Sequence, residues 1–229
     1  MQPLRIKILG TRGYIPESAC RHRKHSGVLI ESLLFDLGEK EFLKYNPKAI
    51  FITHFHPDHA FFVTDHLECR GVPIYAPEKL RNYPQIQVIK KSIRIGKAKV
   101  TPIPTIHSIR VKSQGYLIEM RNKKIFYSSD LITVEKKFRN LFSDLDLVIT
   151  DGSFFKKGGL IRRFGNKIVG HNGMAEIIKL FRPYTSHIIF MHFGSWFIKN
   201  PRQARSQIKS LSEEVLKIEA SFDGQVFEF

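Results

Sequence analysis

The sequence predicts an α/β sandwich in which helices cover β-sheets over one core. Short apolar runs of strand length occur along the whole chain, and amphipathic helical stretches alternate with them in its last third. Because many strands precede this alternation, the helices must pack on the faces of sheets. No Pro/Gly/Ser-rich linker and no repeat of fixed period divides the chain. Residues 1–229 are therefore expected to form a single domain.

The expected strands are apolar runs bounded by turn-forming residues. The runs 115–120 and 124–130 are expected to pair as a hairpin because only the polar sequence RNKK joins them. The complete set, in chain order, is 4–10, 27–31, 32–38, 48–55, 72–77, 86–91, 92–96, 99–104, 115–120, 124–130, 145–151, 186–193 and 225–229.

Helices are expected where apolar residues follow helical spacing or precede a glycine stop. The segment 153–170 is different, because it is rich in glycine and basic residues and contains no acidic residue, so it is expected to be a loop. The predicted helices are 39–45, 59–70, 78–83, 131–142, 173–181 and 201–218.

The charge of the chain is strongly positive. Its 37 Lys and Arg against 21 Asp and Glu give a formal net charge of +16. Such an excess favours anionic partners through long-range attraction and counterion release. We therefore expect a phosphate-containing substrate, with RNA or single-stranded DNA as candidates; a merely solvated basic surface is the alternative interpretation.

The chain has no recognisable membrane segment. No apolar run approaches the roughly 20 residues that span a bilayer, and residues 1–10 contain no secretory apolar region. A cytoplasmic protein without a membrane partner is expected. Cys20 and Cys69 are too few for a disulfide framework and are expected to be free thiols. The oligomeric state is not fixed by the sequence, and a homodimer is one compatible state.

The hexapeptide HFHPDH, residues 54–59, predicts a metal site. It follows an apolar strand, and residues two apart in an extended segment face the same side, so His54 and His56 are placed to hold one ion. Asp58 and His59 follow the bend at Pro57 and are placed to face a second ion. Imidazole and carboxylate ligands without thiolate suit Zn²⁺, although Mn²⁺ and iron accept them as well.

Further ligands are needed to complete two coordination spheres. His107, Asp130 and His192 each end or follow an apolar strand, where a polar side chain does not contribute to the packing of the core. Strand ends are common positions for functional residues. These three residues are therefore the expected additional ligands.

The motif THFHPDH resembles the T-H-x-H-x-D-H signature of the metallo-β-lactamase superfamily. The later order His107, Asp130, His192 and the segments ILGTRGYIP and LLFDLG are similar to that superfamily as well. The resemblance extends over nearly the whole chain and implies a four-layer αββα sandwich with two mixed sheets flanked by helices. It also implies that Asp36 supports a ligand histidine through a hydrogen bond rather than binding metal.

Carried over by position, the resemblance implies two divalent ions bridged by Asp130. Metal one is assigned to His54, His56 and His107, and metal two to Asp58, His59 and His192. Two neighbouring ions lower the pKa of a shared water and stabilise charge on the attacked centre, so hydrolysis is the expected reaction. Asp58 is expected to act in catalysis as well as in metal binding.

The bond that is cleaved depends on residues outside the metal motifs. Asp151 and His171 occur in an order similar to that of ribonuclease Z and related cyclic phosphodiesterases, although Asn172 and Gly173 depart from their pattern. His171 is the expected catalytic proton donor; a polar helix cap is the alternative. The tight hairpin between His107 and Asp130 leaves no room for the tRNA-binding arm of ribonuclease Z, which disfavours dedicated tRNA processing.

Two basic segments, 19–27 and 153–170, are expected to contact substrate phosphates. The first is similar to a region near the site of the related phosphodiesterases, and a solvated loop is its alternative interpretation. The predicted contacts in the first segment are Arg21, Arg23 and Lys24, and those in the second are Lys156, Lys157, Arg162 and Arg163. The leading hypothesis is accordingly a dinuclear metal-dependent phosphodiesterase or nuclease. One alternative is a hydrolase of carboxylic esters, lactones or thioesters, and another is a nucleic-acid-binding protein with a structural metal site.

Overall fold

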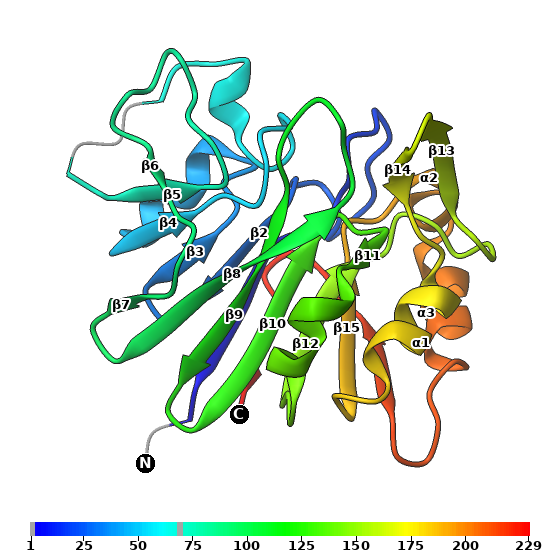
Figure 1. Cartoon of the computed structure of the whole chain (residues 1–229). Helices are drawn as coiled ribbons and strands as arrows, with labels where there is room; N and C mark the ends of the chain where they lie inside the picture. Colours follow the sequence, from blue (N-terminus) through cyan, green and yellow to red (C-terminus); the bar gives the residue numbers. More distant parts are fainter. Residues whose placement is uncertain (1–2, 68–70) are drawn as a thin grey trace.

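The computed structural model describes residues 3–67 and 71–229, and two mixed β-sheets pack face to face in it (Figure 1). The first sheet has the strand order β17-β1-β2-β3-β4-β5-β6. Neighbours from β17 to β3 are antiparallel, and those from β3 to β6 are parallel. The strands are β1 (Arg5–Gly10), β2 (Gly27–Ile30), β3 (Leu33–Phe35), β4 (Ala49–Phe51), β5 (Ile74–Ala76), β6 (Gln87–Val88) and β17 (Val226–Glu228).

The second sheet has the order β11-β8-β9-β10-β12-β15-β16, and β7 pairs with β8. β8, β9 and β10 are antiparallel, whereas β10, β12, β15 and β16 are parallel. The strands are β7 (Ile93–Ile95), β8 (Ala98–Ile106), β9 (Gln114–Met120), β10 (Lys123–Ser129), β11 (Thr133–Val134), β12 (Leu147–Asp151), β15 (His187–Met191) and β16 (Lys217–Ala220).

The main core lies between the two sheets. Ile6 and Ile8 alternate along β1 and point into this core, as strand geometry requires. The ring of Tyr116 from the second sheet lies 5.7 Å from that of Phe35 and 5.3 Å from that of Phe51 in the first. Since residues of both sheets form one buried cluster, the sheets are held as a single sandwich.

Helices cover the outer face of the second sheet (Figure 1). Here α1 buries Met174, Ile177 and Phe181. The outer face of the first sheet is covered by loops and short 3₁₀ helices, whose Phe42, Phe61 and Phe62 pack against it. The four-layer sandwich that was predicted is confirmed, with one thin outer layer. The helices are α1 (Met174–Phe181), α2 (Ser195–Ile198), α3 (Pro201–Lys209), η1 (Lys40–Tyr45), η2 (Phe61–Val63) and η3 (Lys136–Phe142).

The predicted helix at 59–70 is wrong in its described part. Only the 3₁₀ turn η2 forms, because Ala60 makes a bridge to Leu37 and Phe61 donates its N–H to the Leu37 carbonyl. These tertiary contacts use backbone hydrogen-bonding groups that a longer helix would need for its own hydrogen bonds. Residues 68–70, including Cys69, lie outside the described residues.

Three further helix predictions need correction. Residues 78–83 form turns, and 131–142 divides into β11 and the 3₁₀ helix η3. The helix predicted at 201–218 ends at Lys209, because Leu216 and Ile218 pack against the second sheet, and β16, which contains Ile218, pairs with β15. Their apolar spacing therefore belongs to a strand.

The basic segment 153–170 is not a loop throughout. Its second half forms the antiparallel ribbon of β13 (Leu160–Phe164) and β14 (Lys167–His171), which stands apart from both sheets (Figure 1). Sequence analysis missed β13 because all of its side chains are exposed, so its sequence lacks the apolar–polar alternation of a half-buried strand.

No helix within residues 3–67 and 71–229 is long and apolar enough to cross a bilayer.

Candidate metal centre

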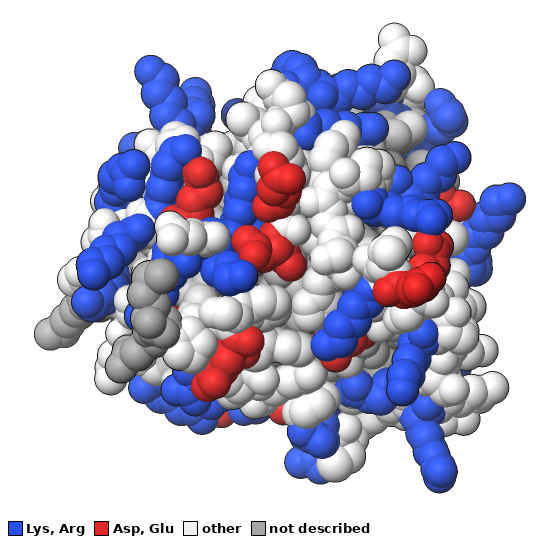
Figure 2. Space-filling model, turned by 90° about the horizontal axis from the view of Figure 1, so that it is seen from below, with Lys and Arg blue, Asp and Glu red and all other residues white. Residues whose placement is uncertain are grey.

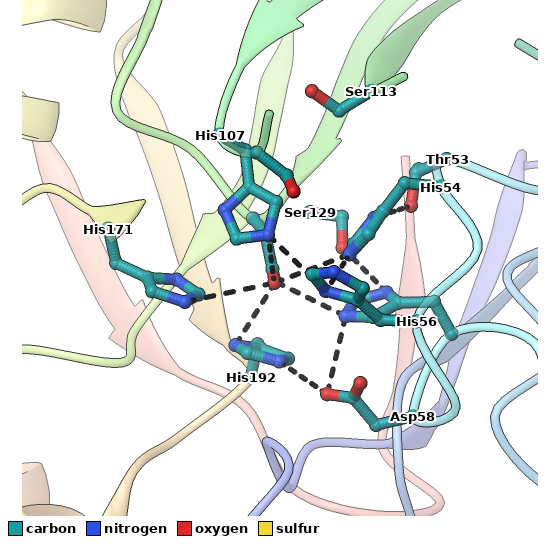
Figure 3. Close-up of polar contacts among 12 residues, drawn as sticks. Thr53, His54, His56, Asp58, His107, Ser113, Ser129, His171 and His192 are labelled. Carbon is teal, nitrogen blue, oxygen red and sulfur yellow. Dashed lines mark hydrogen bonds and ion pairs between the residues drawn. The ribbon is translucent and has the colours of Figure 1, made fainter. Parts of the chain in front are cut away.

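The predicted ligands meet at one edge of the sandwich, where strands of both sheets end. His54 follows β4, His107 follows β8, Asp130 follows β10 and His192 follows β15. Their side chains converge on one point (Figure 3). Parallel neighbours such as β10, β12 and β15 end on the same side of a sheet, so residues distant in sequence become neighbours there.

The first group of ligand atoms surrounds one oxygen of Asp130. Nε2 of His54 lies 3.6 Å and Nε2 of His107 3.4 Å from Asp130 Oδ2. Nδ1 of His56 lies 3.0 Å from His54 Nε2 and 3.4 Å from His107 Nε2. These four residues offer ligand atoms within 4.8 Å of one another, a spacing that suits one ion.

The second group surrounds the other oxygen of Asp130. His59 Nε2 lies 3.2 Å from Asp130 Oδ1 and 3.4 Å from Asp58 Oδ2. His192 Nε2 lies 2.9 Å from Asp58 Oδ2. Asp58, His59 and His192 form a second candidate group, with Asp130 between the two.

Buried atoms without partners test whether metal ions fit this cluster. His59 Nε2 and Asp130 Oδ1 are both buried and accept or donate no hydrogen bond. Leaving buried polar atoms unsatisfied is costly, so such atoms call for an explanation, and an ion between them supplies one. The imidazole and carboxylate donors also match those that hold Zn²⁺. The residues present therefore fit a divalent cation.

Hydrogen bonds around the cluster determine which ring nitrogen faces inward. His59 Nδ1 donates to Asp36 Oδ2 at 2.9 Å, as expected for Asp36, and His107 Nδ1 donates to the Gly170 carbonyl at 2.9 Å. His192 Nδ1 lies 2.8 Å from Ser153 Oγ. Each contact occupies Nδ1 and leaves Nε2 for the cluster, the arrangement typical of histidine ligands.

Strained backbone aims several of these side chains. Asp36, Ser129 and His192 have φ angles of 58°, 52° and 56°, in the left-handed region that residues other than glycine rarely adopt. Each costs of the order of 1–3 kcal/mol and persists only where surrounding contacts enforce it. All three contact the cluster directly or through His59.

The electrostatics differ between the two groups. Burial lowers the pKa of His54 well below its usual value, and the neighbouring His59 adds to the effect. Burial also opposes a charge on His59 and His192, but nearby carboxylates, Asp130 foremost, outweigh it and raise the pKa of His59 well above its usual value and that of His192 to about 10. The second group therefore has the stronger negative field.

Asp151 links His171 to the metal cluster. His171 Nδ1 donates to Asp151 Oδ2 at 2.7 Å, and Ser153 Oγ donates to Asp151 Oδ1 at 2.6 Å. Burial disfavours the charged form of His171, but the carboxylates of Asp151 and Asp130 raise its pKa above the usual value. His171 Nε2 lies 4.0 Å from Asp130 Oδ2, at the edge of the cluster (Figure 3).

A cavity of about 380 Å³ opens beside the second group, and we name it the apolar cavity. Within the described residues, its lining contains His171 and the candidate ligands His56, Asp58, Asp130 and His192, but no Lys or Arg. Gly13 allows the wall to approach, because a Cβ at this position would lie 3.1 Å from Cε1 of His192. The other wall residues that the sequence did not indicate are Tyr14, Ile15, Phe154, Leu160, Ser195 and Trp196.

The predicted phosphate-binding residues lie outside this cavity. Arg21 stacks on the ring of Phe222 at 3.3 Å, and Lys24 forms an ion pair with Glu41. The backbone N–H of Arg23 donates to Asp223. Exposed positions along the segment 153–170 hold the other four, which are Lys156, Lys157, Arg162 and Arg163. Their roles in substrate binding stay predictions.

Basic residues are not confined to the edge that carries the cluster. Figure 2 shows the opposite end of the molecule, where Lys and Arg are spread with Asp and Glu among them. Ion pairs in the sheets include Lys99–Glu119 at 2.6 Å and Lys123–Asp146 at 2.9 Å. A large part of the net charge therefore belongs to a general basic surface.

Comparisons with known proteins define the family. The model described as "Beta-lactamase superfamily domain" matches residues 41–193, so the chain belongs to this superfamily of metal-dependent hydrolases. No curated protein matches the sequence.

Solved structures agree with this fold over essentially the whole chain. The metallo-β-lactamase fold protein YhfI from Bacillus subtilis has a TM-score of 0.73 at 17% identity, covering 100% of both chains. A diphosphatase from the PhnP family has a TM-score of 0.71 at 17% identity, covering 99% of this chain and 97% of its own. Human tRNase Z, short form, has a TM-score of 0.67 at 20% identity, with 97% and 98% covered.

Proposed function

We propose that the protein is a dinuclear metal-dependent phosphodiesterase acting on nucleotides, cyclic phosphates or nucleic-acid ends. The position of His171 carries the proposal. Because its Nδ1 is bonded to Asp151, its Nε2 faces the cluster and lines the apolar cavity. An imidazole at this position can donate a proton to a leaving alkoxide or stabilise negative charge on a phosphorane-like transition state.

The predicted ligands would hold two divalent ions, with Zn²⁺ expected. His54, His56 and His107 would hold one, Asp58, His59 and His192 the other, and Asp130 would contribute an oxygen to each. Two such ions supply a hydroxide near neutral pH and neutralise charge that develops on the substrate.

The remaining steps are assigned to side chains of this chain. Asp58 keeps His192 oriented and is placed to position the attacking water, whereas His171 serves the leaving group. Ser153 and Asp151 couple the two histidines, because one carboxylate holds His171 directly and His192 through the hydroxyl.

The names of two structural neighbours support this substrate class. One is called a diphosphatase of the PhnP family, and another is a tRNase Z. The formal charge of +16 is also consistent with an anionic substrate.

A hydrolase of carboxylic esters, lactones or thioesters is the second candidate. The observation that favours it is the absence of Lys and Arg from the described lining of the apolar cavity. A structural metal site is less well supported, because a structural Zn²⁺ needs four ligands and the cluster offers three overlapping groups of candidate ligands.

The test is hydrolysis by purified protein loaded with Zn²⁺ or Mn²⁺. The substrates are bis-p-nitrophenyl phosphate, 2′,3′-cyclic nucleotides and an acyl thioester, and the control is His59→Ala. Phosphodiester turnover that disappears in His59→Ala is expected. Turnover of the thioester without turnover of either phosphodiester would overturn the proposal in favour of the second candidate.

A further inference from the structure

A second hollow of about 660 Å³ lies beside His107, and we name it the basic groove. Its walls come from the loop 108–113, from β8, from the edge of the first sheet and from the start of β14. The basic groove is lined by four cationic side chains from three separate parts of the chain, which are Lys90, Arg110, Lys112 and Lys167.

These four cations lack acidic partners. Among residues 3–67 and 71–229, none of them forms an ion pair with a carboxylate, unlike Lys99 and Lys123 in the sheets. Glu78 is the acidic residue of the lining, and its carboxylate accepts the backbone N–H of Lys112 at 2.8 Å. The positive charge of the basic groove is therefore largely uncompensated, and a polyanion supplies the missing partners.

The basic groove comes close to the metal cluster at His107 and shares no described lining residue with the apolar cavity. Ser108 follows His107, and Ser113, which is labelled in Figure 3, donates its hydroxyl to the carbonyl of Thr105 at 2.9 Å, two residues before His107. The N–H of Gln114, another wall residue, donates to the carbonyl of Thr53, next to His54. The basic groove thus adjoins His107 through its neighbour Ser108, whereas the lining of the apolar cavity includes the candidate ligands His56, Asp58, Asp130 and His192 together with His171.

We infer that the basic groove binds the phosphate backbone of a single-stranded oligonucleotide whose end enters the metal centre. This inference rests on the proposed phosphodiesterase function. The volume of the basic groove is that of a small-molecule site, which suits a few nucleotides of one strand rather than a duplex. Pro102, Pro104 and Phe138 add apolar surface against which bases can pack, as in other single-strand sites.

The experiment measures binding of a fluorescent RNA of about ten nucleotides, within the range of known single-strand sites. The double variant Lys112→Ala/Lys167→Ala is compared with Lys97→Ala/Lys209→Ala, which removes the same charge from exposed positions. Lys97 lies in the turn before β8, at the far end of that strand from His107, and Lys209 ends α3. Anisotropy is recorded at two salt concentrations, and melting temperatures verify that all variants fold.

The groove variant is expected to bind roughly tenfold more weakly at low salt and to reduce the salt slope by about 2, one unit for each lost phosphate contact. The control variant is expected to remain within about twofold of the parent, because screening weakens distant charges. Equal losses in both variants would overturn the inference. Equal binding of a duplex of the same sequence would also overturn it.

The outcome is separable from that of the proposed function. Hydrolysis of bis-p-nitrophenyl phosphate without groove-dependent RNA binding would refute this inference alone. Groove-dependent RNA binding without hydrolysis of any phosphodiester would refute the proposed function and leave the basic groove as an oligonucleotide-binding site.

Discussion

The apolar cavity and the basic groove share no described lining residue and differ in almost every property. The apolar cavity measures about 380 Å³, contains His171 and has no Lys or Arg in its described lining. The basic groove measures about 660 Å³ and carries four cations without carboxylate partners. The first offers shape and the imidazole of His171, and the second offers charge.

This difference indicates how affinity and chemistry are divided. Charge in an open groove acts over several ångströms and weakens with salt, so it selects polyanions with little regard to their exact position. The apolar cavity acts only on the group that enters it, and there His171 is fixed by Asp151. Substitutions in the apolar cavity and in the basic groove should therefore have different effects on kcat, KM and the salt dependence of binding.

The largest effect is expected when the centre shared by both sides is broken. His59→Ala removes a nitrogen that faces Asp58 and Asp130, so the second ion should be lost. Phosphodiesterase activity should fall by at least about a thousandfold, because the two ions act together. Metal analysis should record about one ion fewer per chain. The exposed His66→Ala is the matched control, and equal losses in both would contradict the assignment.

A smaller effect, confined to the cavity side, is expected for His171→Ala. The rate constant kcat should fall by about 10²–10⁴-fold on a 2′,3′-cyclic nucleotide, the range for loss of a general acid. The loss should be much smaller on bis-p-nitrophenyl phosphate, because p-nitrophenolate leaves without a proton. Metal content should not change. Equal losses on the two substrates would show that His171 is not the proton donor.

Ser153→Ala tests the hydrogen bond that supports the second ligand group. The variant removes the hydroxyl that lies between His192 and Asp151. Metal affinity should weaken by about 10–100-fold, as for other residues that support ligands. Activity should therefore be low at limiting metal and return at saturating metal. Unchanged metal affinity, measured by competition with a chelator, would remove Ser153 from this role.

The smallest effect is expected for Tyr14→Ala, at the mouth of the apolar cavity. Tyr14 is 69% exposed, so its contribution to stability is minor. Loss of one aromatic contact should raise KM about fivefold, the lower part of the range for base stacking, and leave kcat unchanged. This increase should persist at high salt, unlike the effects of the groove variant. If the increase in KM disappeared at high salt, the distinction between the apolar cavity and the basic groove would be contradicted.

Sequence reasoning located the candidate cluster well because its signal is local and dense. HFHPDH places four donors in one turn, and His107, Asp130 and His192 stand where apolar strands end. The structure brings all seven predicted ligands into the two groups. Asp36 is likewise found in its expected contact with His59.

Helix prediction was weaker because it relied on apolar spacing alone. The run after His59 became a 3₁₀ turn once its backbone bonded to Leu37, and Leu216 and Ile218 joined the sheet packing rather than a helix. Ser153 gave no usable signal, since one hydroxyl after an aspartate has many ordinary roles. Its contact with His192 joins residues 39 positions apart.

The sequence by itself determined the fold class and the set of candidate ligand residues, because strand patterns and the types of metal-binding side chain can be recognised in short stretches of sequence. Tertiary structure decided which ring nitrogen faces the cluster, which partner fixes it and where uncompensated charge gathers. These properties depend on contacts between distant segments. The basic groove is the clearest case, because Lys90, Arg110 and Lys167 are brought together only by folding.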